Sequence, residues 1–302
     1  MAGPTVSGLT TSLVEKGPEI FKKHVNDLDL TTAGIQVYKM VSKPIALPKV
    51  AASGNPRPYT AADSTGAGAA ITDRTLTVYQ SKWDFDIDPE QFRNTYLNQF
   101  AGKPDAPEGY QFIMDTVAKA YFAQINDNTI WSGVRNASGT TAAAIATGFE
   151  SLISTELIGG GMTAITTGAI TSANAVTQLD TFVDGLPAWM KKQGCTILCS
   201  AGVWGNYRTH YRTLNTYSFE KNPQGEYNLD GYDNIKLKWV SWLPTASDRL
   251  IATIPGNLIM GTDSNGVEVH TSLNRNIIEV RVMMPVGFQI ADVEALFVNN
   301  VS

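Results

Sequence analysis

Ser200 is the residue whose surroundings come nearest to a catalytic signature. It follows the β-branched and apolar run Cys195–Cys199 and precedes a helical pattern, AGVWGNYRTHYRTL, so it lies at a strand-to-helix turn. The nucleophile of an α/β-hydrolase lies at such a turn, but its G-x-S-x-G motif needs a glycine where this chain has Leu198. We therefore interpret Ser200 as the N-cap of the following helix, with His210 on the surface or at a subunit contact. A hydrolase that uses Ser200 and His210 is the enzymatic alternative.

Three aspartates alternate at Asp84, Asp86 and Asp88, as the first oxygen ligands of a calcium loop do. The rest of the loop does not match, because its sixth position is Pro89 instead of glycine and its twelfth is Thr95 instead of glutamate. We assign the first two aspartates to the polar face of a strand and the third to the cap of a helix.

Two further features lack the partners that chemistry would need. Cys195 and Cys199 lie in an extended run, where residues four apart are about 13 Å from each other, too far for a disulfide. We predict two small buried side chains there, because no cluster of His or Cys completes a metal site. The glycines at 159–161 precede no lysine before Lys191, so they are predicted to form a surface loop and not a phosphate-binding loop. We expect no catalytic residue, no metal and no cofactor.

Length and composition predict a soluble protein with a sizeable core. The chain has 302 residues, of which 43% are hydrophobic, enough for one large domain or two ordinary ones. Residues 1–62 hold seven Lys or Arg and four acids, whereas the whole chain carries a net charge of −5. This balance disfavours a dedicated nucleic-acid reader and predicts an N-terminal segment that is either solvated or in contact with a polyanion or an acidic neighbour. No signal peptide or membrane-length apolar run is apparent, so we expect synthesis in the cytoplasm and no membrane partner.

An extended arm is predicted before the first long helix. Residues 29–50 alternate in the manner of a strand and contain Pro44 and Pro48, which exclude a helix. Residues 74–88 return to strand character after a segment of Gly, Ala and Pro at 51–72. We predict that the two runs pair as a long hairpin with that segment at its tip. Such a hairpin buries too little to be stable alone, so it should be either disordered or laid on something else.

Two helices are predicted after the arm. Asp88 caps the first, with Pro89 at the first helical position, and this helix ends near Gly102. The second spans 107–130, where apolar residues keep one helical face over about 36 Å. A run of small residues at 132–149 follows it and is predicted to turn the chain back on itself.

The second half of the chain is predicted to form an α/β layer and then a closing set of strands. A helix, a strand, a second helix and a second strand follow one another, at 174–192, 195–199, 201–214 and 234–244. Asn265 and Gly266 are expected to mark a hairpin. Two strand-like runs are expected on either side of a break at 285–287.

The order of these pieces resembles the HK97-type fold of major capsid proteins of tailed bacteriophages, over most of the chain. TIWSG followed by GFESLI resembles the family's passage from a spine helix through a glycine loop. The segment 174–214 resembles the helix, strand and helix of the family's axial domain. IEVRVMMPVGFQIADVEALFV resembles the family's closing strands.

The resemblance implies an α+β fold with named parts. These are an N-terminal arm (1–45), an extended E-loop (46–87), a first peripheral part (88–173) with the spine helix at 107–130, an axial domain (174–265) and a second peripheral part (266–302).

The resemblance also implies a non-enzymatic structural protein of the virion, with many copies closing into an icosahedral shell around double-stranded DNA. Copies would meet in pentamers and hexamers, in the host cytoplasm, with separate scaffolding and portal proteins and non-specific contact with the packaged DNA. Contacts between subunits are expected from Arg57, Tyr59, Asp63, Arg74 and Trp83. Residues 51–72 contain no lysine, which argues against the isopeptide crosslink that some members form from this loop.

Two other readings stay open beside this one. An encapsulin-like compartment uses the same fold to enclose a cargo enzyme, and the sequence alone does not separate it from a virus. A secreted adhesin-like β protein is disfavoured by the long central helix and the missing export signal.

Overall fold

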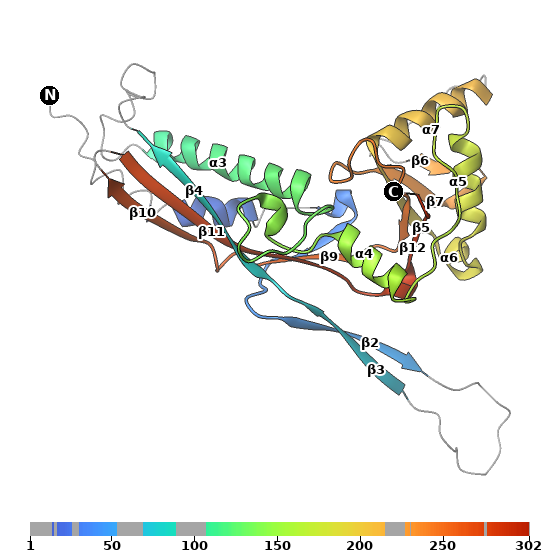
Figure 1. The fold of residues 1–302 in the computed structure, drawn as a ribbon, viewed down its shortest axis with the longest axis horizontal. Helices are drawn as coiled ribbons and strands as arrows, with labels where there is room; N and C mark the ends of the chain where they lie inside the picture. The colour runs from blue at the N-terminus through green and yellow to red at the C-terminus, as the bar shows by residue number, and fades with distance from the viewer. Residues whose placement is uncertain are drawn as a thin grey trace, which may run out of the picture.

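In the part of the chain that the structure describes, two five-stranded sheets and a two-stranded hairpin form the framework (Figure 1). The structure is a computed structural model, and it describes residues 14, 17–25, 30–52, 69–88, 107–214, 227–229, 231–274 and 277–301. Helices and strands are mixed along the chain, which confirms the α+β class.

The larger sheet is built around one long strand. It consists of β1 (Ile35–Tyr38), β4 (Tyr79–Ile87), β9 (Leu258–Thr262), β10 (Glu268–Asn274) and the central β11 (Ile277–Ile290). β4 pairs with one edge of β11, and β10 and β9 pair one after the other with its opposite edge. Val286 of β11 accordingly has a partner on each side, Tyr79 in β4 and Thr262 in β9. Alternate β11 side chains from Ile278 to Met284 are buried, as expected for a half-buried strand.

Two sequence predictions are wrong at this sheet. Asn265 and Gly266 do not close a hairpin, because β9 and β10 run in the same direction along β11. Residues 285–287 do not interrupt β11 either, since the strand runs through them. Pro285 is tolerated because it lies opposite the gap between β9 and β10, where its missing N–H has no ladder partner to bond.

The smaller sheet carries helices on one face. Its strands are ordered β12 (Leu296–Val298), β8 (Ile251–Thr253), β5 (Cys195–Cys199), β7 (Tyr232–Trp239) and β6 (Tyr227–Leu229). The helices α5 (Ala175–Asp184) and α7 (Ala201–Leu214) share a buried apolar cluster with it, and α6 (Ala188–Gln193) lies beside them (Figure 1). This arrangement confirms the predicted strand and second helix, but the first predicted helix, 174–192, is divided into α5 and α6 at residues 185–187.

The long helix α3 (Pro107–Asn128) covers the larger sheet together with the helical residues 17–25 (Figure 1). Phe21, Val25, Met114 and Tyr121 belong to one buried cluster with β11. The helix ends two residues before the predicted 130, because the N–H groups of both residues after Asn128 donate to one carbonyl, that of Ile125. The helix predicted after Asp88 lies outside the described residues.

Strand pairing does not follow the predicted domain boundaries. β9, within 174–265, pairs in the larger sheet, and β12, within 266–302, pairs in the smaller one. β4, within 46–87, also belongs to the larger sheet. The boundaries themselves stay a prediction.

Candidate functional site

The hairpin of β2 (Ile45–Ala52) and β3 (Ala69–Leu76) projects from the body of the protein (Figure 1). Its antiparallel register runs from Ile45 opposite Leu76 to Ala52 opposite Ala69. A hairpin is therefore confirmed, but its second strand is not the predicted run 74–88, because β3 begins at Ala69, within the predicted tip, and ends at Leu76. Residues 77–78 separate β3 from β4, which joins the larger sheet instead.

Glycines allow the base of the hairpin to cross closely over the larger sheet. A Cβ atom on Gly287 would lie 2.1 Å from the carbonyl oxygen of Thr77, and one on Gly261 would lie 2.9 Å from Val78. Any other residue at 287 would push the hairpin base away. Leu76 is fully buried at this crossing, in a small cluster that also contains Ile259.

Lys49 fixes β2 to the body by ion pairs. Its Nζ lies 2.8 Å from Asp292 Oδ1 and 2.7 Å from Glu294 Oε2. Asp292 is the N-cap of the short helix η4 (Val293–Ala295), and Glu294 lies within that helix. Glu294 is 81% exposed, so the half-buried Asp292 is the more effective partner. The pKa of Lys49 is raised, because partial burial, which lowers it, is outweighed by the hydrogen bonds and charges of these two carboxylates.

Arg74 fixes β3 in the same way. Its Nη2 lies 2.7 Å from Glu156 Oε1 in α4 (Phe149–Ile158) and 3.4 Å from Gln289 Oε1 in β11. The Gln289 amide also donates to the carbonyl of Thr75 at 2.8 Å. Each strand of the hairpin is thus held by its own cation, on the face that points towards the body.

The opposite face of the hairpin presents apolar side chains to solvent. Val50 and Ile71 are register partners, and they are 64% and 67% exposed. Side chains alternate between faces along a strand, so this pair lies on the face opposite Lys49 and Arg74. An exposed apolar pair on a projecting hairpin is suited to contact with another surface.

The residues predicted to make subunit contacts divide into two groups. Arg57, Tyr59 and Asp63 lie outside the described residues. Arg74 bonds within its own chain, and Trp83 in β4 packs against Tyr121 of α3 with ring centroids 5.9 Å apart. Subunit contacts by these five residues stay a prediction.

The ion pairs that hold the hairpin to the body were not predicted from the sequence. Lys49 lies just before the predicted tip of the arm, and its partner Asp292 lies 243 residues further along the chain. The strand alternation places Lys49 on the same face as Leu47, which packs against the cluster at the hairpin base. That signal could have indicated that the lysine points inward.

The small-residue loop after α3 closes tightly at its neck. Gly148 N donates to Gly133 O at 2.8 Å. A Cβ on Gly133 would lie 2.4 Å from the Thr129 carbonyl oxygen, and one on Gly148 would lie 2.4 Å from that of Trp131. These glycines are required by close backbone approach, which confirms the predicted turn of the chain.

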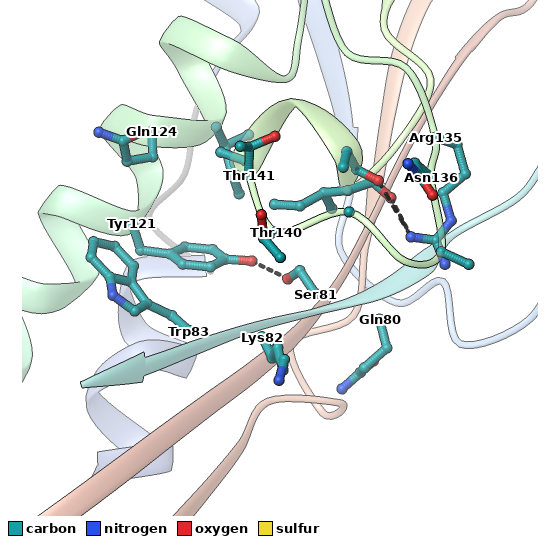
Figure 2. A pocket seen from close by; sticks show the side chains of 16 residues that line it. Gln80, Ser81, Lys82, Trp83, Tyr121, Gln124, Arg135, Asn136, Thr140 and Thr141 are labelled. Carbon is teal, nitrogen blue, oxygen red and sulfur yellow. Dashed lines mark hydrogen bonds between the residues drawn. The ribbon is translucent and has the colours of Figure 1, made fainter. Parts of the chain in front are cut away.

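This loop also borders a polar hollow of about 500 Å³ between α3 and β4 (Figure 2). Arg135 donates to the carbonyls of Ala144 and Ile145 and lies 4.5 Å over the ring of Tyr79. Burial raises the pKa of Tyr121 far above its ordinary value, and its hydroxyl shares a short hydrogen bond with Ser81. Ser81 also donates to the backbone of β11, so these hydroxyls join elements together and are not poised to react.

The candidates for nucleophilic chemistry serve structural roles. Ser200 accepts a hydrogen bond from Val203 N at 3.2 Å and donates to Ser247 O at 2.7 Å, which confirms it as the N-cap of α7. The prediction for His210 is wrong: it is 9% exposed, and its Nδ1 accepts from Val176 N at 3.0 Å. It is buried because it bonds the first turn of α5, whose N–H groups have no partner within that helix.

The two cysteines and the aspartates of β4 follow their predictions. Cys195 and Cys199 are buried and free, and burial raises the pKa of Cys195 to about 11, so it is a poor nucleophile. Asp84 and Asp86 are exposed, and Asp84 accepts from Arg281 Nε at 2.6 Å.

The described residues contain neither a candidate metal site nor a candidate membrane-spanning helix. In that part of the chain, no three His, Cys, Asp or Glu side chains are grouped so that they could hold a metal ion. Among the described helices, none has the length and apolar character needed to span a membrane.

Comparison with solved structures identifies the fold. A chain of the procapsid of satellite phage P4, which includes the size determination protein, aligns with a TM-score of 0.57 at 11% identity, covering 92% of this chain and 96% of that one. The capsid of an empty GTA particle gives 0.55 at 15% identity, covering 90% of each chain. The capsid of Myoviridae phage XM1 gives 0.54 at 11% identity, covering 88% and 89%.

These alignments extend over nearly the whole of each chain. The protein therefore has the fold of phage capsid proteins, and the predicted resemblance is confirmed at this level. No protein-family model and no curated protein sequence matches the chain.

Proposed function

We propose that this protein is the major capsid protein of a tailed bacteriophage, whose copies assemble into a closed icosahedral shell. The observation that carries the proposal is the capsid fold over about 90% of the chain, combined with a projecting hairpin whose outer face is apolar. A shell is held by a large contact area repeated over many copies and needs no catalytic site. Ser200 and His210 accept hydrogen bonds from the first turns of two helices, which agrees with this non-enzymatic role.

Each part of the fold has a role in the proposed assembly. The hairpin β2–β3 and its tip correspond to the E-loop, α3 to the spine helix, the larger sheet to the peripheral domain and the smaller sheet with α5–α7 to the axial domain. The E-loop lies across a neighbouring copy, and the axial domains meet around five-fold and six-fold centres. Scaffolding and portal proteins assist assembly in the host cytoplasm, and DNA fills the finished virion capsid through non-specific contact.

A deletion tests the hairpin's part in assembly. Residues 51–70 are replaced by Asn-Gly, which joins the register partners Val50 and Ile71 through a two-residue turn and keeps Lys49 and Arg74. We expect a folded, soluble subunit that forms no shells in electron micrographs, because the outer part of the contact is missing. Normal shells from this variant would contradict the hairpin's role.

The content of purified particles decides between a virus and a compartment. Nuclease-protected double-stranded DNA inside particles from the native source supports the capsid. A single copurifying enzyme and no DNA would support the encapsulin-like alternative.

A further inference from the structure

Two short segments of the chain, here called the crossings, pass between the two sheets and lie against each other. β8 of the smaller sheet continues into β9 of the larger through 254–257, and β11 returns to β12 through 291–295. Asn257 joins the crossings: its carbonyl accepts from Ala291 N at 2.9 Å, and its Oδ1 accepts from Asp292 N at 2.7 Å. Its Nδ2 donates back to Asp292 O at 2.9 Å.

The same amide reaches a strand end in the smaller sheet. Asn257 Nδ2 lies 3.1 Å from Thr253 Oγ1, at the end of β8, and 3.3 Å from the carbonyl of Ala295, just before β12. Asn257 is only 3% exposed, so water does not compete for these bonds. A side-chain amide suits the position because it donates and accepts at once.

Asp292 connects this crossing to the hairpin. Its backbone N–H and carbonyl are bonded to Asn257, while its Oδ1 accepts from Glu294 N at 3.0 Å and from Lys49 Nζ at 2.8 Å. Lys49 lies within β2. Hydrogen bonds therefore run without interruption from the projecting hairpin to the point where the two sheets join.

We propose that Lys49, Asp292 and Asn257 couple the direction of the hairpin to the relative position of the two sheets. A shift at the crossing moves η4 and the Asp292 carboxylate, and Lys49 follows that carboxylate. By thermodynamic reciprocity, a shift of the hairpin acts back on the crossing. The coupling belongs to the single subunit, so its test succeeds or fails whether or not the protein builds shells.

Hydrogen exchange of the full-length unassembled chain tests whether a change in the hairpin alters the crossings. Lys49→Met keeps the apolar stem and removes the charge. We expect exchange to rise about two- to fivefold at 45–52 and also at 254–257 and 291–295, within the range that partly exposed ion pairs allow. Lys49→Arg should restore much of the protection, and Lys43→Met, which removes an exposed charge just before β2, should change neither region.

Thr253→Val tests whether a change in the smaller sheet, outside the hairpin, alters the hairpin. It removes an acceptor of the Asn257 amide with little change of shape, and unchanged exchange in β7 verifies that the smaller sheet is intact. We expect faster exchange at 45–52 in this variant, and no further increase when Lys49→Met is added. The coupling is overturned if Lys49→Met changes exchange only in the hairpin, or if Thr253→Val leaves exchange in the hairpin unchanged. It is also overturned if the two substitutions have additive effects on exchange in the double variant.

Discussion

Polar side chains in this protein join segments that lie far apart in the sequence. Lys49 pairs with Asp292, Ser200 bonds the carbonyl of Ser247, and His210 accepts from the start of α5. None of these residues has a free, activated group beside a base. At the residue scale, the protein therefore uses its polar groups to fix the shape of the subunit.

Ser200→Ala should lower the free energy of unfolding by about 1–2 kcal/mol, because a helix cap and a hydrogen bond to Ser247 are both lost. Urea denaturation followed by circular dichroism measures the change. Ser132→Ala, which removes an exposed hydroxyl bonded to Asn128, is the control and should cost less. Equal effects in the two variants would contradict the capping role.

The ion pair between Asp84 and Arg281 should make part of the protein's stability depend on pH. The hydrogen bond from Arg281 lowers the pKa of Asp84, more than partial burial raises it. The pair therefore stabilises the protein above the unfolded pKa of about 4, and this contribution is lost as the pH falls through the lower folded value. We expect Asp84→Asn to be less stable than wild type at pH 7, by under about 1 kcal/mol since the pair is half-exposed.

Urea denaturation at several pH values checks this expectation. The difference between Asp84→Asn and wild type should shrink as the pH falls below about 4. Asp86→Asn removes the same charge from the same face of β4 without touching the contact to Arg281, and should show a smaller difference at pH 7. A wild-type advantage that persists at pH 2 would contradict the assignment.

At the element scale, the two faces of the hairpin carry charged and apolar side chains, respectively. Its inner face carries Lys49 and Arg74, which bind the chain's own body, and its outer face carries the exposed pair Val50 and Ile71. Alternation along the strands enforces this division, since a shift of one residue in register would exchange the two faces.

Replacing the outer pair tests the use of that face. Val50→Thr with Ile71→Thr keeps β-branched side chains, so the hairpin should persist and subunit stability should change by under about 0.5 kcal/mol. We expect the concentration needed for shell assembly to rise at least about tenfold, because apolar contact area is lost in every copy. Light scattering measures assembly.

Ile158→Thr is the matched control for the outer pair, because this side chain is 88% exposed at the end of α4. It should assemble like wild type. Assembly that is equally impaired in the control and in the hairpin variant would show that the outer face has no special role.

Local sequence patterns predicted most helices and strands, but they could not predict features that depend on pairing between distant segments. The presence of a hairpin, α3, the turn after it and the helices around β5 follow from alternation, helical period and composition. The continuity of β11 through Pro285 does not, because it depends on a gap between two strands on the neighbouring edge. The anchor between Lys49 and Asp292 likewise depends on a fold that brings together residues 243 positions apart.

At the scale of the whole molecule, the described elements are arranged as the proposed assembly requires. A body of two sheets joined at Asn257 carries a hairpin that extends beyond it (Figure 1). Its fold matches capsid chains over about 90% of their length. In the proposed assembly, each copy contacts its neighbours through the projecting hairpin, and the shell closes by repeating that contact.

Electron microscopy of the purified full-length protein tests this account most directly. The account predicts closed particles of uniform icosahedral shape, in which class averages resolve the hairpin lying across an adjacent copy. Small globular species alone, at every protein and salt concentration and with coexpressed partners from the same source, would contradict it.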